Sequence, residues 1–188
     1  TYGGSEAFSV LETADHGYLA CGTFQYGASV TYLELLRTDM DGSQVWMKTL
    51  PLAGDVGEGR WIENTADGNY IVGGIAGNSN DTSWKMLLVK ANDSGDTLWT
   101  RRFSGILSAG GSCVQPTSDQ GFVACGYTDG TLQGQKEVYL VKTDGNGTVT
   151  GVKENQAATG IRARTNPCGE ELNIRGKDDI QSVTILDP

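Results

Sequence analysis

The residues with the most evident chemical capacity are oxygen-bearing side chains at predicted turns and on the short strands beside them. Asp, Asn and Gly gather at several turns, and a second acidic group lies on alternating apolar segments. Carboxylate and amide oxygens are the ligands that Ca²⁺ prefers, and loops can supply them jointly with water. The candidate calcium ligands are Glu12, Glu63, Asn64, Asp39, Asp41 and Asp93.

A calcium site is one interpretation of these residues, and plain β-turns are the other. Tight turns require the same residue types, because Asp and Asn hydrogen-bond to nearby backbone and Gly accepts positive φ. No turn is followed by the distal bidentate Glu of an EF-hand loop. The sequence therefore requires no cofactor and leaves Ca²⁺ as an option.

Histidine-based catalysis has little support in the sequence. The single histidine, His16, lies in a predicted turn, and the positions 52 residues apart from it hold Gly68 and Gln120. Neither glycine nor glutamine acts as a general base, so His16 is predicted to be a turn residue. A Ser-His-Asp triad would need this histidine, and no Gly-x-Ser-x-Gly motif is present. No catalytic residue is assigned.

The tryptophans divide into repeated and unrepeated positions. Trp46 and Trp99 occupy equivalent positions, which favours packing between repeats over ligand binding. Trp61 and Trp84 have no aromatic equivalents. These two are the candidate platforms for a sugar or an acyl chain.

The four cysteines form no zinc pattern, since no Cys-x-x-Cys occurs. Cys21 and Cys125 share a strand position with Gly73, which indicates that this position needs a small residue. Cys113 and Cys125 flank one predicted hairpin and face each other only if its turn is centred on Asp119. Space-filling thiols and a Cys113–Cys125 disulfide therefore both remain open.

Charge and hydropathy exclude several classes of protein. The chain has 14 basic and 23 acidic residues, a net charge of −9 and a pI near 4.5. This charge would repel a nucleic-acid backbone. No apolar run approaches the ~18 residues of a membrane-spanning helix. The hydrophobic fraction of 38% is too high for a disordered tail.

Internal repeats predict the elements that must position these residues. Three segments align, reading SVLETADHGYLACG from Ser9, WIENTADGNYIVGG from Trp61 and CVQPTSDQGFVACG from Cys113. A second block repeats in step with the first, and its turns contain Gly42, Gly95 and Gly147. Asp15, Asp67 and Asp119 lie 52 residues apart. A period of this length is typical of a structure built from repeated units.

Each repeat reads as four short strands, and no segment shows sustained helical periodicity. Strands are predicted at residues 8–13, 18–23, 32–38, 44–50, 85–91, 97–103 and 138–143. Four antiparallel strands per repeat predict a β-propeller blade, whereas a β-sandwich predicts no such period and solenoid coils are shorter. Because propellers need about four to eight blades, we expect an all-β partial propeller or one completed by oligomerisation.

The repeat pattern, S-V-x-x-T-x-D-x-G-Y followed by L-x-K-T-D-x-x-G-x-x-x-W, resembles the repeats of large secreted bacterial proteins from Bacteroidota-like lineages. The tail resembles the opening of the type IX secretion C-terminal sorting domain. That resemblance rests on Asn166-Pro167, on ELNI from Glu171 and on IQSVTILD from Ile180. Thr165 stands where the family's first Pro lies, and the chain stops at Pro188, before the family's later Gly and Lys motifs.

The repeats and the tail together predict the organisation of the chain. Blades are expected at about residues 3–50, 51–103 and 104–153, a linker at 154–164 and a partial sorting-domain-like tail at 165–188, with strands at 171–174 and 181–186. Thr1-Tyr2 aligns with the end of a fourth strand, so we expect a preceding blade. The sorting-domain resemblance implies a secreted or cell-surface location.

Two functions from different classes fit the sequence. The first is a secreted or cell-surface propeller module with a binding or scaffold role toward a glycan, small molecule or surface partner. The second is a Ca²⁺-dependent hydrolase of esters or lactones, of the acyl-homoserine lactone type, with the cation in the channel. Repetition without a unique constellation favours the first. The expected protein partners are a second copy, giving a homodimer, or further blades of a parent protein.

Overall fold

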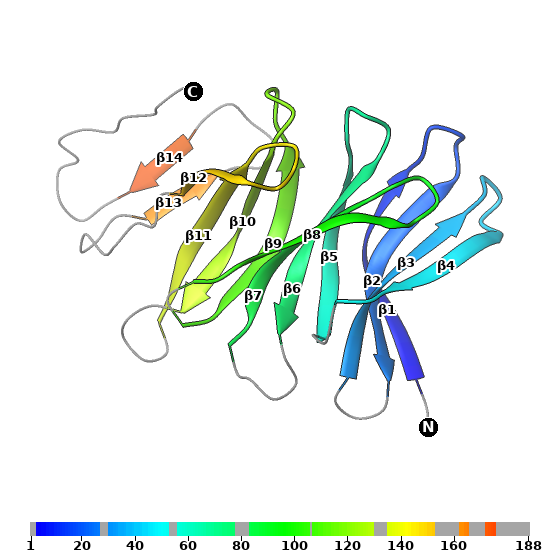
Figure 1. Ribbon diagram of the computed structural model, residues 1–188, viewed down its shortest axis with the longest axis horizontal. Coiled ribbons are helices and arrows are strands. Elements are labelled where there is room, and N and C mark those ends of the chain that lie inside the picture. Colours follow the sequence, from blue (N-terminus) through cyan, green and yellow to red (C-terminus); the bar gives the residue numbers. More distant parts are fainter. Residues whose placement is uncertain are drawn as a thin grey trace. The chain divides into compact units, whose positions relative to one another are not determined.

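The computed structural model describes residues 3–26, 30–52, 56–77, 83–105, 107–129, 135–152, 162–165 and 172–175. Within these ranges the chain is all-β and contains no helix, hence none that is long and apolar enough to cross a membrane (Figure 1). The first twelve strands form three four-stranded antiparallel sheets, each with its strands in sequence order. The predicted all-β fold of three four-stranded repeats is therefore confirmed.

The three sheets carry equivalent strands, and they are not closed into a ring. Sheet 1 contains β1 (Gly3–Glu12), β2 (Tyr18–Tyr26), β3 (Val30–Thr38) and β4 (Gln44–Leu50). Sheet 2 contains β5 (Val56–Asn64), β6 (Tyr70–Gly77), β7 (Lys85–Ala91) and β8 (Thr97–Phe103). Sheet 3 contains β9 (Ala109–Pro116), β10 (Phe122–Asp129), β11 (Lys136–Thr143) and β12 (Val149–Val152). The predicted strands lie within these bounds, except that the strand predicted at 8–13 runs one residue past the end of β1. β1, β2, β3 and β11 are longer than the strands predicted for them.

A β-bulge recurs between the first two strands of every sheet. The register shifts between Ala7 and Ser9 in β1, between Gly59 and Trp61 in β5, and beside Cys113 in β9. A glycine on the second strand lies opposite each bulge, at Gly22, Gly74 and Gly126. A Cβ atom at any of the three would overlap a carbonyl oxygen of the facing strand. The repeated glycine is therefore required by close approach of two backbones.

The turn between the first two strands explains the repeated Thr-x-Asp motif. The Thr13 amide donates to the carbonyl of Gly17 at 2.9 Å, and the Thr13 hydroxyl donates to the Asp15 carboxylate at 2.7 Å. His16 has a φ of 64°, and its equivalents Gly68 and Gln120 are also left-handed. His16 is thus a turn residue held in the conformation that glycine adopts most easily.

A cation from the third strand completes each of these turns. Arg37 contacts Asp15, and the Lys90 ammonium lies 2.6 Å from the Asp67 carboxylate. Lys142 lies 2.6 Å from Asp119 in the same way. In every sheet the carboxylate of the repeated Asp therefore accepts a hydrogen bond from a threonine hydroxyl and forms an ion pair with a cation of the same sheet.

Two apolar clusters join the sheets face to face. The first lies between sheets 1 and 2 and includes Leu33, Leu35, Val72 and Val89. The second lies between sheets 2 and 3 and includes Ile71, Met86, Leu88, Val114 and Phe122. Alternate residues of β6 and β7 enter opposite clusters, because successive side chains of a strand point to opposite faces. Sheet 2 is therefore covered on both faces.

The chain divides into one compact unit at Thr1–Lys153 and a second at Glu154–Pro188. The second contains an antiparallel pair, β13 (Arg162–Thr165) and β14 (Leu172–Arg175). β14 lies near the strand predicted at 171–174, whereas β13 begins inside the segment predicted to be a linker. The strand predicted at 181–186 and the residues Thr1-Tyr2 lie outside the described residues.

Candidate functional site

Four of the candidate site residues lie on first strands of the sheets, Glu12 on β1 and Trp61, Glu63 and Asn64 on β5. The amide of Ile62 on β5 donates to the Ser9 hydroxyl on β1 at 3.3 Å. The Gln115 side-chain amide on β9 donates to the Glu63 carboxylate on β5 at 2.6 Å. Each bond joins residues about one repeat apart in sequence. The polar side chains of these strands therefore hydrogen-bond across neighbouring sheets.

A mixed polar cluster lies where β5 meets β9. The Glu63 carboxylate accepts one hydrogen bond from Gln115 and a second from the Trp61 indole N–H at 2.8 Å. Cys113 lies two residues before Gln115, and the charge of Glu63 raises the pKa of its thiol. Cys125 lies directly opposite Cys113 on β10. We call these five residues the β5–β9 cluster.

The two thiols of this cluster perturb each other's pKa. The neighbouring Cys125 thiol raises the pKa of Cys113 above its usual range, and burial and the nearby Glu63 charge act in the same direction. The neighbouring Cys113 thiol lowers the pKa of Cys125 to about 6, against the opposing effect of burial. Two alternatives were predicted for this hairpin, free thiols and a disulfide. In the structure both thiols are free, and the two cysteines are direct partners on β9 and β10.

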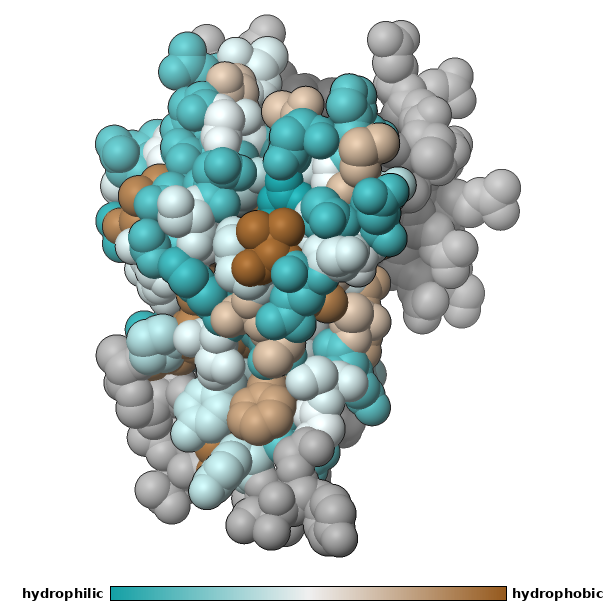
Figure 2. All heavy atoms as spheres, turned by 90° about the vertical axis from the view of Figure 1, so that its right-hand side faces the viewer, coloured by the Kyte–Doolittle hydropathy of each residue, from teal (hydrophilic) through white to brown (hydrophobic). Residues whose placement is uncertain are grey.

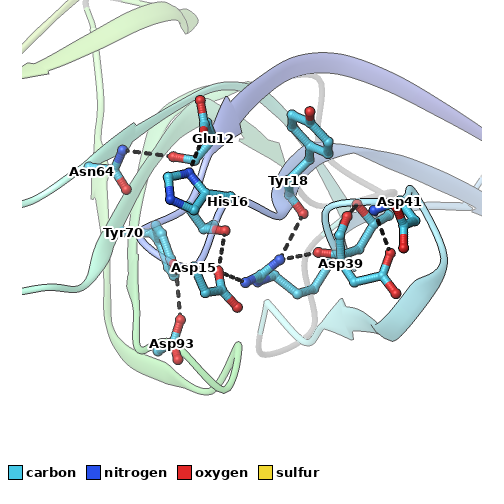
Figure 3. Close-up of polar contacts among 12 residues, drawn as sticks. Glu12, Asp15, His16, Tyr18, Asp39, Asp41, Asn64, Tyr70 and Asp93 are labelled. Atoms are coloured by element: carbon cyan, nitrogen blue, oxygen red, sulfur yellow. Dashed lines mark hydrogen bonds and ion pairs between the residues drawn. The ribbon is translucent and has the colours of Figure 1, made fainter.

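Among the predicted calcium ligands, Glu12 and Asn64 lie side by side on β1 and β5 (Figure 3). The Asn64 side-chain amide donates to the Glu12 backbone carbonyl at 3.4 Å. The Glu12 carboxylate contacts Nδ1 of His16 at 2.8 Å. Glu63 is held instead by Trp61 and Gln115. The three candidate ligands on the first strands are thus divided between two groups of contacts, Glu12 with Asn64 in one and Glu63 in the other.

The remaining predicted calcium ligands lie in turns, apart from this pair (Figure 3). The Asp39 carboxylate accepts the backbone N–H groups of Asp41 at 3.0 Å and Ser43 at 2.8 Å, which closes the β3–β4 turn. Asp93 accepts the Tyr70 hydroxyl at 2.8 Å. Within the described part of the chain, no group of three or more His, Cys, Asp or Glu side chains is placed to hold a metal ion.

The two candidate tryptophans do not form one platform. Trp61 is opposite Gly73 on β6, whereas the Trp84 ring packs over Gly77, four residues further along that strand. Four strand residues span about 13 Å. Trp84 is also tied to β9, because the Ala109 amide donates to its carbonyl at 2.7 Å. Trp61 is the more exposed of the two and belongs to the β5–β9 cluster.

Sequence reasoning singled out no residue of the exposed face of sheet 1. Val10 is 64% exposed, whereas its equivalent Ile62 is 2% exposed inside the first apolar cluster. Tyr18 is 44% exposed, whereas Tyr70 is 4% exposed. Figure 2 looks at the side of the first unit formed by sheet 1 and shows apolar side chains amid hydrophilic ones. Comparing hydropathy among the three repeats could have found this face.

A second feature distinguishes this face from the equivalent faces of sheets 2 and 3. The Trp46 ring of sheet 1 packs over Gly95 in the β7–β8 turn, and a Cβ at Gly95 would lie 2.6 Å from it. Trp99 of sheet 2 packs over Gly147 in the same way. Gly42, the equivalent glycine of sheet 1, has nothing within 4 Å of its Cβ position. Its φ of 82° matches the other two, so the turn is formed while its indole contact is missing.

The fourth strand of sheet 3 lacks the tryptophan that sheets 1 and 2 have at this position. Gly151 pairs with Lys142, as Trp46 pairs with Arg37 and Trp99 with Lys90. Gly151 therefore occupies the position of the repeated tryptophan. Sheet 1 has a turn glycine, Gly42, on which an indole ring could pack, and sheet 3 has no tryptophan on its fourth strand.

No protein-family model matches this chain, and no curated protein matches it.

Proposed function

We propose that the chain is a secreted or cell-surface β-propeller module with a binding and scaffold role. Its exposed sheet faces bind further four-stranded repeats of the same kind. The observation that carries this proposal is the exposure of Val10, whose equivalents Ile62 and Val114 are buried where one sheet packs on another. A face with this composition gains free energy by being covered.

The partner that fits the sheet 1 face is a repeat with tryptophan on its fourth strand. Both sheet-to-sheet junctions in the molecule place such an indole over a turn glycine, at Gly95 and Gly147. The Gly42 turn lacks this contact. A second copy of the chain, docked through sheet 3, would present Gly151 at that position. The geometry therefore supports a further repeat as the partner in preference to the homodimer.

A binding role also agrees with the use of the polar residues. The repeated carboxylates Asp15, Asp67 and Asp119 are each engaged by a cation of their own sheet. Asp39 is engaged by backbone amides. These side chains stabilise turns, which leaves the sheet faces as the features without an internal role. Export is part of the proposal because the tail resembles a sorting domain.

The experiment adds one further repeat to the chain. A copy of residues 51–108 is added before Gly3, so that its own tryptophan can contact Gly42 as Trp99 contacts Gly147. Because Val10 is 64% and Tyr18 44% exposed, covering what remains exposed of both is worth about 1.5–3 kcal/mol. We therefore expect the extended chain to unfold cooperatively at a higher urea concentration than the original chain.

The matched control carries glycine at the tryptophan position of the added copy, as Gly151 does in sheet 3. It should lose much of the gain in unfolding free energy. An added repeat that unfolds independently and leaves the original midpoint unchanged would contradict the proposed docking face. A tight homodimer of the original chain in sedimentation velocity would instead show that the second copy is the partner.

A further inference from the structure

Cys113 and Cys125 are placed as a cross-strand pair in sheet 3. They are direct partners in the antiparallel register of β9 and β10. Residues opposite each other in such a pair have Cα atoms about 4.5–5.5 Å apart, within the ~4.4–6.8 Å range of disulfides. Each thiol also perturbs the pKa of the other. No large movement of the backbone is needed to join them.

The equivalent pairs in the other sheets cannot form this link. Ser9 is opposite Cys21 in sheet 1, and Trp61 is opposite Gly73 in sheet 2. Cys21 is also 1% exposed, and burial raises the pKa of its thiol to about 12. Cys113 and Cys125 are both partly exposed, so a small reagent can reach them. The dithiol is therefore specific to sheet 3 and accessible.

We propose that Cys113 and Cys125 form a reversible disulfide that fastens β9 to β10 in sheet 3. The link would join the two strands beside the bulge, where the register is irregular. This inference concerns the chemistry of one hairpin and does not depend on the docking of further repeats. An oxidising exterior would favour the linked form, and a reducing compartment the dithiol.

The reaction is a thiol–disulfide exchange with a small-molecule disulfide such as oxidised glutathione. One cysteine thiolate attacks a sulfur of the reagent, forms a mixed disulfide and releases one glutathione thiolate. The thiolate of the second cysteine then attacks the protein sulfur of that mixed disulfide and releases the second glutathione thiolate. The two cysteine thiols are oxidised, one oxidised glutathione is reduced to two glutathione molecules, and the protons pass to solvent.

The test uses the full chain, fully reduced and then equilibrated with oxidised glutathione. We expect the intact mass to fall by two hydrogen atoms, and peptide mapping to show one link between Cys113 and Cys125. Dithiothreitol should restore both thiols. As an independent measurement, the reduced chain should bind one equivalent of phenylarsine oxide, a reagent that bridges two neighbouring thiols, and lose two reactive thiols.

Single variants separate this pair from the other cysteines. Cys113→Ser and Cys125→Ser should each abolish the link and the arsenical binding, while Cys21→Ala and Cys168→Ser should leave both unchanged. The thermal midpoint of each variant verifies that it is folded. A link to Cys168 or Cys21, stable glutathione adducts on both Cys113 and Cys125, or no reaction at either residue would overturn the proposal.

Discussion

Replacing Gly74 by alanine tests the close approach of β5 and β6 that recurs in every sheet. A Cβ at Gly74 would overlap the Glu58 carbonyl oxygen and lie 3.0 Å from the Glu58 carbonyl carbon. All of these atoms belong to backbone, so no flexible side chain can move aside. An ordinary contact of about 3.5 Å requires the two strands to separate locally.

The cost of Gly74→Ala follows from that separation. A shift of about 1 Å carries neighbouring N–H···O bonds beyond their ~3.2 Å limit. Losing two such bonds costs about 1–3 kcal/mol, and overpacking adds about 1–3 kcal/mol. We therefore expect Gly74→Ala to lower the free energy of unfolding by about 2–6 kcal/mol, a large part of the stability of a domain.

The assay is urea unfolding followed by fluorescence of the four tryptophans. The matched control is Gly4→Ala on β1, where a Cβ meets nothing within 4 Å and alanine should cost nothing. Gly126→Ala should behave like Gly74→Ala, because its Cβ would overlap the Gly110 carbonyl oxygen. A Gly74→Ala chain as stable as the Gly4→Ala chain would refute the reasoning.

Three further predictions concern the turns and the division of the chain. Hydrogen bonds from Lys142 and Thr117 hold the pKa of Asp119 below its usual range, and those from Lys90 and Thr65 do so for Asp67 despite the opposing effect of burial. The stabilisation that these two carboxylates contribute is therefore complete above the unfolded pKa of about 3.9 and is lost as the pH falls below it. Replacing both Asp67 and Asp119 by Asn should flatten the dependence of the urea midpoint on pH between about 5 and 2. Gln120→Gly removes a left-handed non-glycine residue and should raise the unfolding free energy by about 0.5–1 kcal/mol in the same assay, with no gain if the turn differs. Deleting residues 154–188 should leave the thermal midpoint of the first unit unchanged, and a large drop would contradict the division at Lys153.

The repeat positions could be predicted from sequence because side-chain type and backbone conformation are tied at turns. Gly42, Gly95 and Gly147 all have positive φ, which few other residues accept. The strand pattern was equally readable, since alternating residues enter opposite apolar clusters. The equivalence of Gly151 with Trp46 also followed from the register.

The candidate site was less predictable because its contacts join residues one repeat apart. The Glu63–Gln115 and Asn64–Glu12 bonds depend on how neighbouring sheets pack. The Cys113–Cys125 partnership depended on the register of a single bulged hairpin. β13 was missed because its short, charged segment has no strand alternation.

The exposed face of sheet 1 is the basis of the proposed function, and hydroxyl-radical footprinting of the dilute, monomeric chain tests it most directly. Modification of Tyr18 and of Met47, which is 50% exposed on β4, is read by mass spectrometry. It is compared with modification of Tyr70, which is buried and donates to Asp93. The account predicts that Tyr18 and Met47 react readily while Tyr70 is protected at least several-fold. Protection of Tyr18 equal to that of Tyr70 in the monomer would contradict it.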